Sequence, residues 1–277
     1  MSDSGRDADR YAVIGYPVAH SRSPVIHTVF AAQTGQRLRY EAIEVSPGDL
    51  EATLQKLVRE GFRGLNVTMP HKSEIVRLVD DMSEHAASAG AINTVTNDGG
   101  RLHGDNTDGI GLVRDLLGNR QWPLEGRRLL ILGAGGATRG IVRPLLEQGP
   151  ANIRIANRSV DKAVALAAHF SSYGEVTSSR FRDLADEPPY DLVINATSAG
   201  LDGRRAGFPE TIVGPATYCY DLAYGSGSTP FLNWAKEHGA AAAASGWGML
   251  VEQAAESFRI WRSVLPDTAD VLSRYDS

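Results

Sequence analysis

A glycine-rich run provides the first residues of this chain with a clear chemical use. Residues 133–137 read Gly-Ala-Gly-Gly-Ala and directly follow the apolar stretch 128–132. Such a turn between a buried strand and a helix presents backbone N–H groups and a helix N-terminus to a pyrophosphate. Thr138 stands at the third glycine position of the G-x-G-x-x-G/A pattern, so the match is partial. A plain strand-to-helix turn without a ligand is the alternative that the run itself leaves open.

The residues after the run supply the context that a nucleotide site needs. An apolar stripe over 141–146 predicts a helix, and Gly149 with Pro150 predicts its end. Residues 153–156 then predict a second buried strand. The whole is a βαβ unit of roughly 30 residues, the size expected of a dinucleotide site.

The end of that second strand indicates which dinucleotide binds. An acidic residue there, roughly 20 residues after the glycines, would hold a ribose 2′-hydroxyl. The chain instead has Asn157, Arg158 and Ser159, and Lys162 follows one helical turn later. A guanidinium is a planar, permanent cation suited to a phosphate dianion, so we expect NADP(H). The alternative is a surface charge at Arg158 and a helix N-cap at Ser159.

Polar clusters before the glycine-rich run suggest where a substrate binds. In residues 20–24, Ser23 is expected to cap a helix, and Ser21 with it could bind a carboxylate at the positive helix end. The cluster 66–72 ends in Lys72, and Asp108 stands at another helix start. A lysine and a carboxylate can both hydrogen-bond to one hydroxyl, and the ammonium can protonate an alkoxide as it forms. As structure alone, Asp108 is a favourable first-turn charge.

Alternating strands and helices must position these residues. The expected strands are 11–14, 40–45, 65–69, 91–95, 101–103, 128–132, 153–156, 191–196, 217–221 and 240–244. Expected helices start at Ser23, Leu50 and Thr107, and others cover 73–79, 83–89, 230–237 and 250–261. This alternation is typical of parallel sheets with helices on both faces. Two such sets predict two α/β lobes with a ligand cleft between them.

Composition excludes several other classes of protein. The chain has 277 residues, a formal net charge of -5 and no clustered Lys/Arg face, which argues against nucleic-acid binding. Its one cysteine, Cys219, lies in an apolar run and is expected in the core, in a reducing, cytoplasmic compartment. Residues 1–10 lack a signal-peptide core and are expected to form a disordered tail. No apolar window is long enough to span a membrane.

No His/Cys/Asp spacing supports a metal site, and His20 and His71 are interpreted as polar residues of the cleft. We expect a monomer or a homodimer.

Several motifs together resemble the shikimate dehydrogenase family. The resemblance covers residue 11 to the last helix. Its motifs, in the order of the family, are 15–17 with 20–24, 66–72, 91–94, 104–109, the glycine-rich run, 157–159, 195–198, 220–224 and 248–254.

The resemblance implies a two-lobed α/β enzyme that reversibly reduces 3-dehydroshikimate to shikimate with NADPH, a step toward chorismate and the aromatic amino acids. It implies a substrate domain over 1–106 with 247–277 and a Rossmann-type NADP domain over 107–246. Lys72 and Asp108 would be the catalytic pair. The substrate would contact Ser21, Ser23, Thr68, Asn93, Tyr224 and Gln253. The cofactor would contact Gly133, Ala134, Gly135, Gly136, Ala137, Asn157, Arg158, Ser159, Lys162, Thr197, Leu222 and Gly246, with Asn195 and Ser198 close by.

Some positions depart from the family pattern. Tyr16 stands where a small polar residue is common, and Lys162 where an arginine often contacts the 2′-phosphate. Ser245 and Trp247 flank Gly246, where an acid and a smaller apolar residue are usual.

Two alternatives remain. A quinate/shikimate dehydrogenase would often lack one of the paired serines, and both are present here. A non-catalytic NADPH-binding sensor would have no need of Lys72, Asp108 and Gln253.

Overall fold

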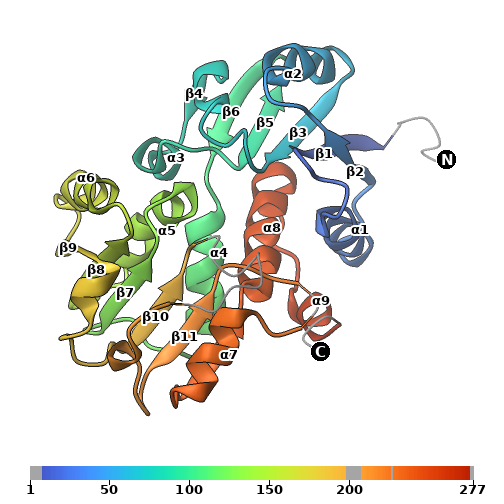
Figure 1. The fold of residues 1–277 in the computed structure, drawn as a ribbon. Coiled ribbons are helices and arrows are strands. Elements are labelled where there is room, and N and C mark those ends of the chain that lie inside the picture. The colour runs from blue at the N-terminus through green and yellow to red at the C-terminus, as the bar shows by residue number, and fades with distance from the viewer. Residues whose placement is uncertain (1–7, 198–206, 226, 275–277) are drawn as a thin grey trace. The chain divides into compact units, whose positions relative to one another are not determined.

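The computed structural model describes residues 8–197, 207–225 and 227–274, and they form two compact α/β units. Unit 1 comprises the described residues up to Thr107 together with Val251–Arg274, and unit 2 runs from Asp108 to Leu250. Figure 1 shows both units with their elements labelled. The first junction lies one residue, and the second four residues, after the predicted domain boundaries. The assignment of substrate and cofactor to these units stays a prediction.

Unit 1 is built on a mixed six-stranded sheet of order β2-β1-β3-β5-β6-β4. Its strands are β1 (Asp9–Gly15), β2 (Leu38–Glu44), β3 (Phe62–Val67), β4 (Asp81–Met82), β5 (Thr94–Asp98) and β6 (Arg101–Asp105). The strands β2, β1 and β3 run parallel, whereas β5 pairs antiparallel with both β3 and β6. The strands predicted at 91–95 and 101–103 lie at Thr94–Asp98 and Arg101–Asp105, and they form an antiparallel hairpin that makes this sheet mixed rather than parallel.

Helices cover both faces of the unit 1 sheet. They are α1 (Ser23–Gln33), α2 (Leu50–Arg59), α3 (Glu84–Ala89) and the C-terminal part of α8 (Trp247–Arg262), after which the short α9 (Ala269–Ser273) follows. On one face, Leu50, Leu54 and Leu57 of α2 pack with apolar residues of β1 and β3. On the other, His27 of α1 lies among aromatic rings that include Phe258 of α8. Helix α2 begins at Leu50, as predicted.

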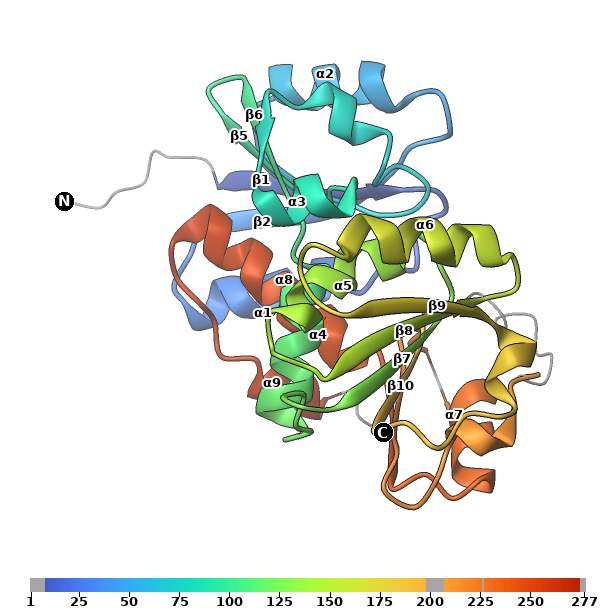
Figure 2. The same ribbon diagram turned by 90° about the vertical axis from the view of Figure 1, so that its left-hand side faces the viewer.

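Unit 2 is a fully parallel, doubly wound sheet of order β12-β11-β10-β7-β8-β9. Its strands are β7 (Arg128–Leu132), β8 (Asn152–Asn157), β9 (Val176–Arg180), β10 (Leu192–Asn195), β11 (Tyr218–Asp221) and β12 (Ala242–Ser245). Its helices are α4 (Asp108–Arg114), which continues as a π-turn over Asp115–Asn119, α5 (Gly136–Leu146), α6 (Val160–Phe170) and α7 (Pro230–Glu237). Figure 2 shows α5 and α6 on one side of this sheet and α7 on the other.

The core of unit 2 follows from strand alternation. Leu129 and Ile131 face the cluster that holds α4, α5 and α6, while Leu130 and Leu132 face the cluster that holds α7. Cys219 is fully buried in the second cluster, as predicted, and burial raises the pKa of its thiol to about 12. A thiol protonated at neutral pH is a core residue and no nucleophile.

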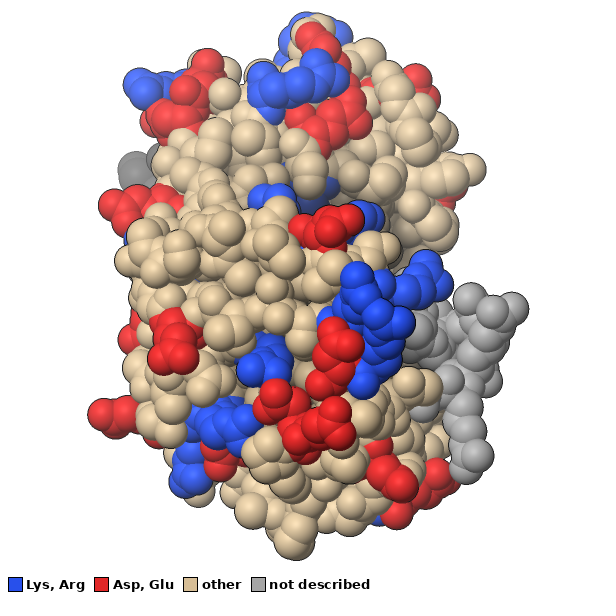
Figure 3. All heavy atoms as spheres, turned by 60° about the vertical axis from the view of Figure 1, so that its left-hand side comes forward, with Lys and Arg blue, Asp and Glu red and all other residues tan. Residues whose placement is uncertain are grey.

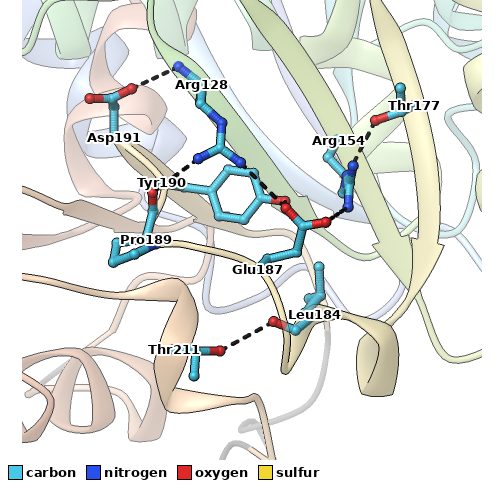
Figure 4. A network of polar contacts seen from close by, with 9 residues as sticks. All are labelled: Arg128, Arg154, Thr177, Leu184, Glu187, Pro189, Tyr190, Asp191 and Thr211. Carbon is cyan, nitrogen blue, oxygen red and sulfur yellow. Dashed lines mark hydrogen bonds and ion pairs between the residues drawn. The ribbon is translucent and has the colours of Figure 1, made fainter.

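A cluster of charged residues ties together the amino ends of the unit 2 strands (Figure 4). Glu187 accepts hydrogen bonds from Arg128 of β7 and Arg154 of β8. Asp191, just before β10, accepts from the backbone N–H of Arg128 at 2.8 Å and pairs with Arg127 at 3.2 Å. Each of these two carboxylates therefore has a guanidinium partner, which suits a structural role.

Several local predictions were wrong. Asp9 and Arg10 belong to β1 rather than to a disordered tail, whereas residues 1–7 lie outside the described residues. Strand β3 covers Phe62–Val67 rather than 65–69, and the predicted helix 73–79 is a 3₁₀ turn over Ile75–Leu78. The last long helix begins at Trp247, three residues before the predicted start.

Candidate active site

The glycine turn between β7 and α5 combines one conformational need with two open positions. Gly133 has a φ of 110°, which side chains of L-residues rarely adopt, and a Cβ there would lie 2.9 Å from the Ala196 carbonyl oxygen. By contrast, a Cβ on Gly135 or Gly136 would meet no heavy atom within 4 Å. Packing of the described residues therefore explains Gly133 but neither of the other two, whose lack of side chains leaves the backbone open to a ligand.

The start of α5 completes an anion site at this turn. Gly135 is the N-cap, with no side-chain capping bond and no acidic residue in the first turn. Thr138, at the third glycine position, is fully buried, and its hydroxyl donates to the Gly133 carbonyl at 2.9 Å. The threonine thus closes the turn from inside and leaves the positive end of the helix dipole available to a phosphate.

The turn between β8 and α6 carries the predicted NADP-specific residues. Arg158, Ser159 and Lys162 are exposed, and the half-buried Asn157 amide donates to the Ser159 carbonyl at 2.9 Å. Ser159 is the N-cap of α6 but makes no side-chain capping bond, so capping does not account for its hydroxyl. On the face drawn in Figure 3, basic side chains lie among acidic ones. That face therefore shows mixed charge rather than a continuous basic surface.

The segments after β10, β11 and β12 bring three predicted cofactor residues to the same edge of the sheet. Thr197 donates from its backbone N–H and its hydroxyl to the Asn195 side-chain oxygen, at 3.1 and 2.7 Å. The Leu222 N–H donates to the Asn195 carbonyl at 2.9 Å. A Cβ on Gly246 would lie 2.3 Å from the Leu222 carbonyl oxygen, so only glycine allows this approach. Thr197, Leu222 and Gly246 are therefore held around Asn195.

Two more predicted residues belong to these loops. Tyr224 is 39% exposed, so its ring is accessible to a ligand. Ser198 lies outside the described residues.

The predicted acid is fixed by a close helix crossing. Asp108 is the first residue of α4 and is 7% exposed. A Cβ on Gly109 would lie 2.5 Å from the Gly140 carbonyl and 2.4 Å from Pro144 Cγ, so α4 and α5 approach at backbone distance. Because α5 starts at the glycine turn, the position of Asp108 is set relative to the proposed pyrophosphate site.

A buried polar network in unit 1 joins two predicted substrate residues. The Asn93 amide donates to Thr107 Oγ1 at 3.0 Å and to Gln253 Oε1 at 3.2 Å. The backbone N–H of Thr107 donates to Asn93 Oδ1 at 2.8 Å. Asn93 and Gln253 lie 160 positions apart in the chain, and the structure brings them together.

The same network has members that sequence reasoning did not assign to the site. Asn66 of β3 accepts from the Tyr40 hydroxyl at 2.7 Å and donates to Ser257 Oγ at 3.0 Å. Ser257 also contacts Thr94 Oγ1 at 2.8 Å. A serine one helical turn after Gln253, on an otherwise apolar helix face, was the available indication in the sequence.

The predicted lysine follows the carboxyl end of β3. Lys72 is half-buried, and its carbonyl accepts the Ile92 N–H at 2.8 Å, next to Asn93. The Thr68 N–H donates to the Ile14 carbonyl at 2.9 Å, so the start of this loop is tied to β1. Both residues therefore lie in a loop anchored at the carboxyl ends of the unit 1 strands, where open α/β sheets bind ligands.

Ser21 and Ser23 lie at the start of α1, but their hydrogen bonding differs from the prediction. Arg22 is the N-cap of α1, and Ser23 is the first helical residue, so the predicted cap at Ser23 is wrong. Ser21 Oγ instead accepts the Ser23 N–H at 3.3 Å. Ser23 is 5% exposed, whereas Ser21 is half-buried. The two hydroxyls still lie at one helix start, as the carboxylate hypothesis needs.

His71, predicted to be a polar cleft residue, is fully buried. One of its ring nitrogens, Nε2, lies 2.7 Å from the Val45 carbonyl, which makes Nε2 the donor. The Val45 N–H in turn donates to the Gly15 carbonyl at 2.9 Å. His71 thus links the loops that follow β2 and β3. Among the residues that the structure describes, no group of three or more His, Cys, Asp or Glu could hold a metal ion.

Unit 2 therefore has the architecture of a dinucleotide-binding α/β domain, and family models match both units. The models of a shikimate dehydrogenase substrate-binding domain, a shikimate/quinate 5-dehydrogenase and a shikimate 5′-dehydrogenase C-terminal domain match residues 13–95, 116–202 and 246–273. A shikimate dehydrogenase (NADP(+)) from Dechloromonas aromatica is 50% identical over 96% of this chain and 97% of its own length. The chain belongs to the shikimate dehydrogenase family.

Solved structures agree. An Ael1 enzyme from Pseudomonas putida is 46% identical, with a TM-score of 0.92 over 97% of this chain and 98% of its own. The shikimate 5-dehydrogenase of Thermus thermophilus, in complex with NADP(H) and shikimate, is 35% identical. Its TM-score is 0.87 over the same shares of the two chains.

Proposed function

We propose that this chain is an NADP-dependent shikimate dehydrogenase, which reversibly reduces 3-dehydroshikimate to shikimate on the way to chorismate and aromatic amino acids. The observation that carries the proposal is the 50% identity to a shikimate dehydrogenase (NADP(+)) over 96% of this chain and 97% of its own. The residue chemistry is consistent with it, because both half-sites carry polar groups of the required type at the carboxyl ends of the strands.

The cofactor half-site is assigned to residues 107–246. The open positions at Gly135 and Gly136 and the start of α5 would receive the pyrophosphate. Arg158 and Lys162, with Asn157 and Ser159 beside them, would hold the 2′-phosphate. Thr197, Leu222 and Gly246 would line the nicotinamide end. When bound, NADPH supplies the hydride.

The substrate half-site is assigned to residues 1–106 with 247–277. Ser21 and Ser23, with Tyr224 from the other unit, would bind the carboxylate, and Thr68, Asn93 and Gln253 would bind ring hydroxyls. The Lys72 ammonium would stabilise the negative charge that develops on the carbonyl oxygen and donate a proton to it. Asp108 would orient that ammonium and share the reacting hydroxyl. In the oxidation direction Lys72 takes the proton back.

The compartment proposed is the reducing cytoplasm, because Cys219 is the one cysteine of the chain and is buried as a free thiol. Within the described residues, no helix combines the length and the apolar character needed to cross a bilayer.

The test is a matrix of absorbance assays at the NADPH band, with shikimate or quinate crossed against NADP⁺ or NAD⁺. We expect turnover with shikimate and NADP⁺, and at least about tenfold lower kcat/KM when either partner is exchanged, since a polar site discriminates strongly against a misplaced group. Turnover with quinate alone would make the protein a quinate dehydrogenase, and a preference for NAD⁺ would overturn the cofactor assignment. Nucleotide binding without turnover in any combination would favour the sensor.

A further inference from the structure

The carboxylate of Asp221 organises the loops that we assign to the cofactor, although it belongs to none of the predicted contacts. Asp221 is the last residue of β11 and is 2% exposed. Its Oδ1 accepts hydrogen bonds from the Asn195 amide at 3.0 Å and from the Ala223 N–H at 3.1 Å. Its Oδ2 accepts from the Thr229 hydroxyl. One side chain therefore touches the end of β10, the loop after β11 and the start of α7.

Two of these contacts are connected to residues of the proposed site, and the third fixes the start of α7. The Asn195 side chain, held through its amide, uses its oxygen to fix the backbone and the hydroxyl of Thr197. The Ala223 carbonyl accepts the Gly246 N–H at 3.0 Å. Thr229 caps α7 by accepting the Leu232 N–H at 3.3 Å. Asp221 is thus the common anchor for Thr197, the 222–224 loop and Gly246.

The electrostatics of Asp221 do not suit a purely stabilising residue. All three donors that contact its carboxylate within the described part of the chain are neutral, and burial raises its pKa. Burying a charge without an opposite charge beside it costs free energy. A fold keeps such a residue where the residue brings another advantage. The amino end of the same sheet shows the usual alternative, because Asp191 there pairs with Arg127.

We propose that Asp221 is a positioning residue for the cofactor, holding the loops after β10 and β11 in the geometry that receives the nicotinamide end of NADP(H). The inference rests on the proposed function and extends it to a residue that makes no cofactor contact itself. Its loss should therefore weaken the binding of the cofactor more than the binding of shikimate, which the anchored loops reach through Tyr224.

The test compares Asp221→Ala with Asp191→Ala, a matched loss of an aspartate that accepts a backbone N–H at the opposite end of the sheet. We expect Asp221→Ala to raise KM and Kd for NADP⁺ at least about tenfold, since three donors lose their acceptor. KM for shikimate should rise less, because Tyr224 is the only residue of the anchored loops that we assign to the substrate. Asp191→Ala should leave both constants near wild type. Asp221→Asn retains an oxygen toward Asn195 and Ala223 and should restore most of the affinity.

Hydrogen exchange gives a second readout that does not depend on catalysis. Exchange at the Thr197 and Ala223 amides should accelerate in Asp221→Ala and not in Asp191→Ala. Equal effects of the two alanine variants on NADP⁺ affinity, in an active wild-type background, would overturn the positioning role alone. A wild-type protein without NADP⁺-dependent turnover would overturn the proposed function and this inference together.

Discussion

The two ends of the unit 2 sheet differ in whether their charged and polar groups have partners of opposite charge. At the amino end, Glu187 and Asp191 each have a guanidinium partner, and Arg128 also lies over the Tyr190 ring at 4.7 Å (Figure 4). At the carboxyl end, the donors that Asp221 has among the described residues are neutral, Gly135 and Gly136 are open, and Arg158 is exposed.

Within one sheet, this difference distinguishes polar groups that stabilise the fold from polar groups that would bind a ligand. Where charges neutralise one another, as around Glu187, the arrangement is complete without a ligand. Among the described residues, the start of α5 and the cations of the β8–α6 turn have no such partner, and in the proposed function an anionic ligand would supply it. Variants of the open or exposed groups at the carboxyl ends of the strands should therefore lose activity with little loss of stability, and variants of the ion pairs at the amino end should do the reverse.

The largest expected effect lies at the carboxyl end of β3 in unit 1. Lys72→Ala should lower kcat on the order of 10²-fold or more with a modest change in KM, because the alanine cannot stabilise or protonate the alkoxide. The melting temperature should stay near that of wild type. Steady-state kinetics and a thermal melt measure the two, with Lys56→Ala on α2 as the control lysine. A raised KM with unchanged kcat would reduce Lys72 to a binding residue.

A matched pair of glycine variants separates conformation from ligand access at the turn. Gly135→Ala should raise Kd for NADP⁺ about tenfold, equivalent to about 1.4 kcal/mol, without lowering the melting temperature. Gly133→Ala should instead destabilise the protein by about 1–3 kcal/mol, because of its φ of 110° and its contact with Ala196. Titration of NADPH fluorescence and urea unfolding measure these effects. Loss of stability in Gly135→Ala would contradict the open position.

At the amino end, Glu187→Gln tests the purely structural side of the comparison. Loss of charge opposite Arg128 and Arg154 should lower the stability of unit 2 by about 1 kcal/mol, and the melting temperature by about 2–4 °C. Kinetic constants should not change. The exposed Glu175→Gln is the control, and reduced activity in Glu187→Gln at full stability would break the comparison.

The smallest effect at neutral pH concerns an ionisable ring buried in unit 1. His27 stacks on Tyr40 with ring centroids 4.2 Å apart, and burial lowers its pKa to about 3 from 6.5. The folded protein thus binds this proton less readily than the unfolded chain, so stability is complete above pH 6.5 and falls toward pH 3, by about 1.4 kcal/mol per unit. His27→Phe keeps a stacked ring and should flatten this slope in urea unfolding, whereas the exposed His169→Phe should not.

Much of unit 2 could be predicted from the sequence, because its strands are short apolar runs with clear ends. The strand over Arg128–Leu132 and the helix over Pro230–Glu237 were predicted with their observed bounds. The strand β9 was missed, since Val176–Arg180 is a largely polar edge strand without an apolar repeat. The two-residue strand β4 was missed because it is too short to carry a pattern.

The site was predictable in its parts but not in its connections. Single residues such as Lys72 and Asp108 stand in motifs, whereas the contact of Asn93 with Gln253 depends on folding over 160 positions. A serine before proline is typical of an N-cap, but here the helix starts one residue earlier, which moved that role away from Ser23. Asp221 was visible only as one letter of a motif, because its importance comes from hydrogen bonds to three different segments.

The crossing of α4 over α5 has a consequence for protein engineering. Because Gly109 and Gly140 meet at backbone distance, Asp108 is held in place by unit 2. Lys72 belongs to unit 1. A chimera that exchanges residues 108–250 between relatives would therefore transplant the acid and the glycine turn as a single piece. Grafts cut just before β7 would instead divide that piece, and they would need a glycine at position 109 that fits against the incoming α5.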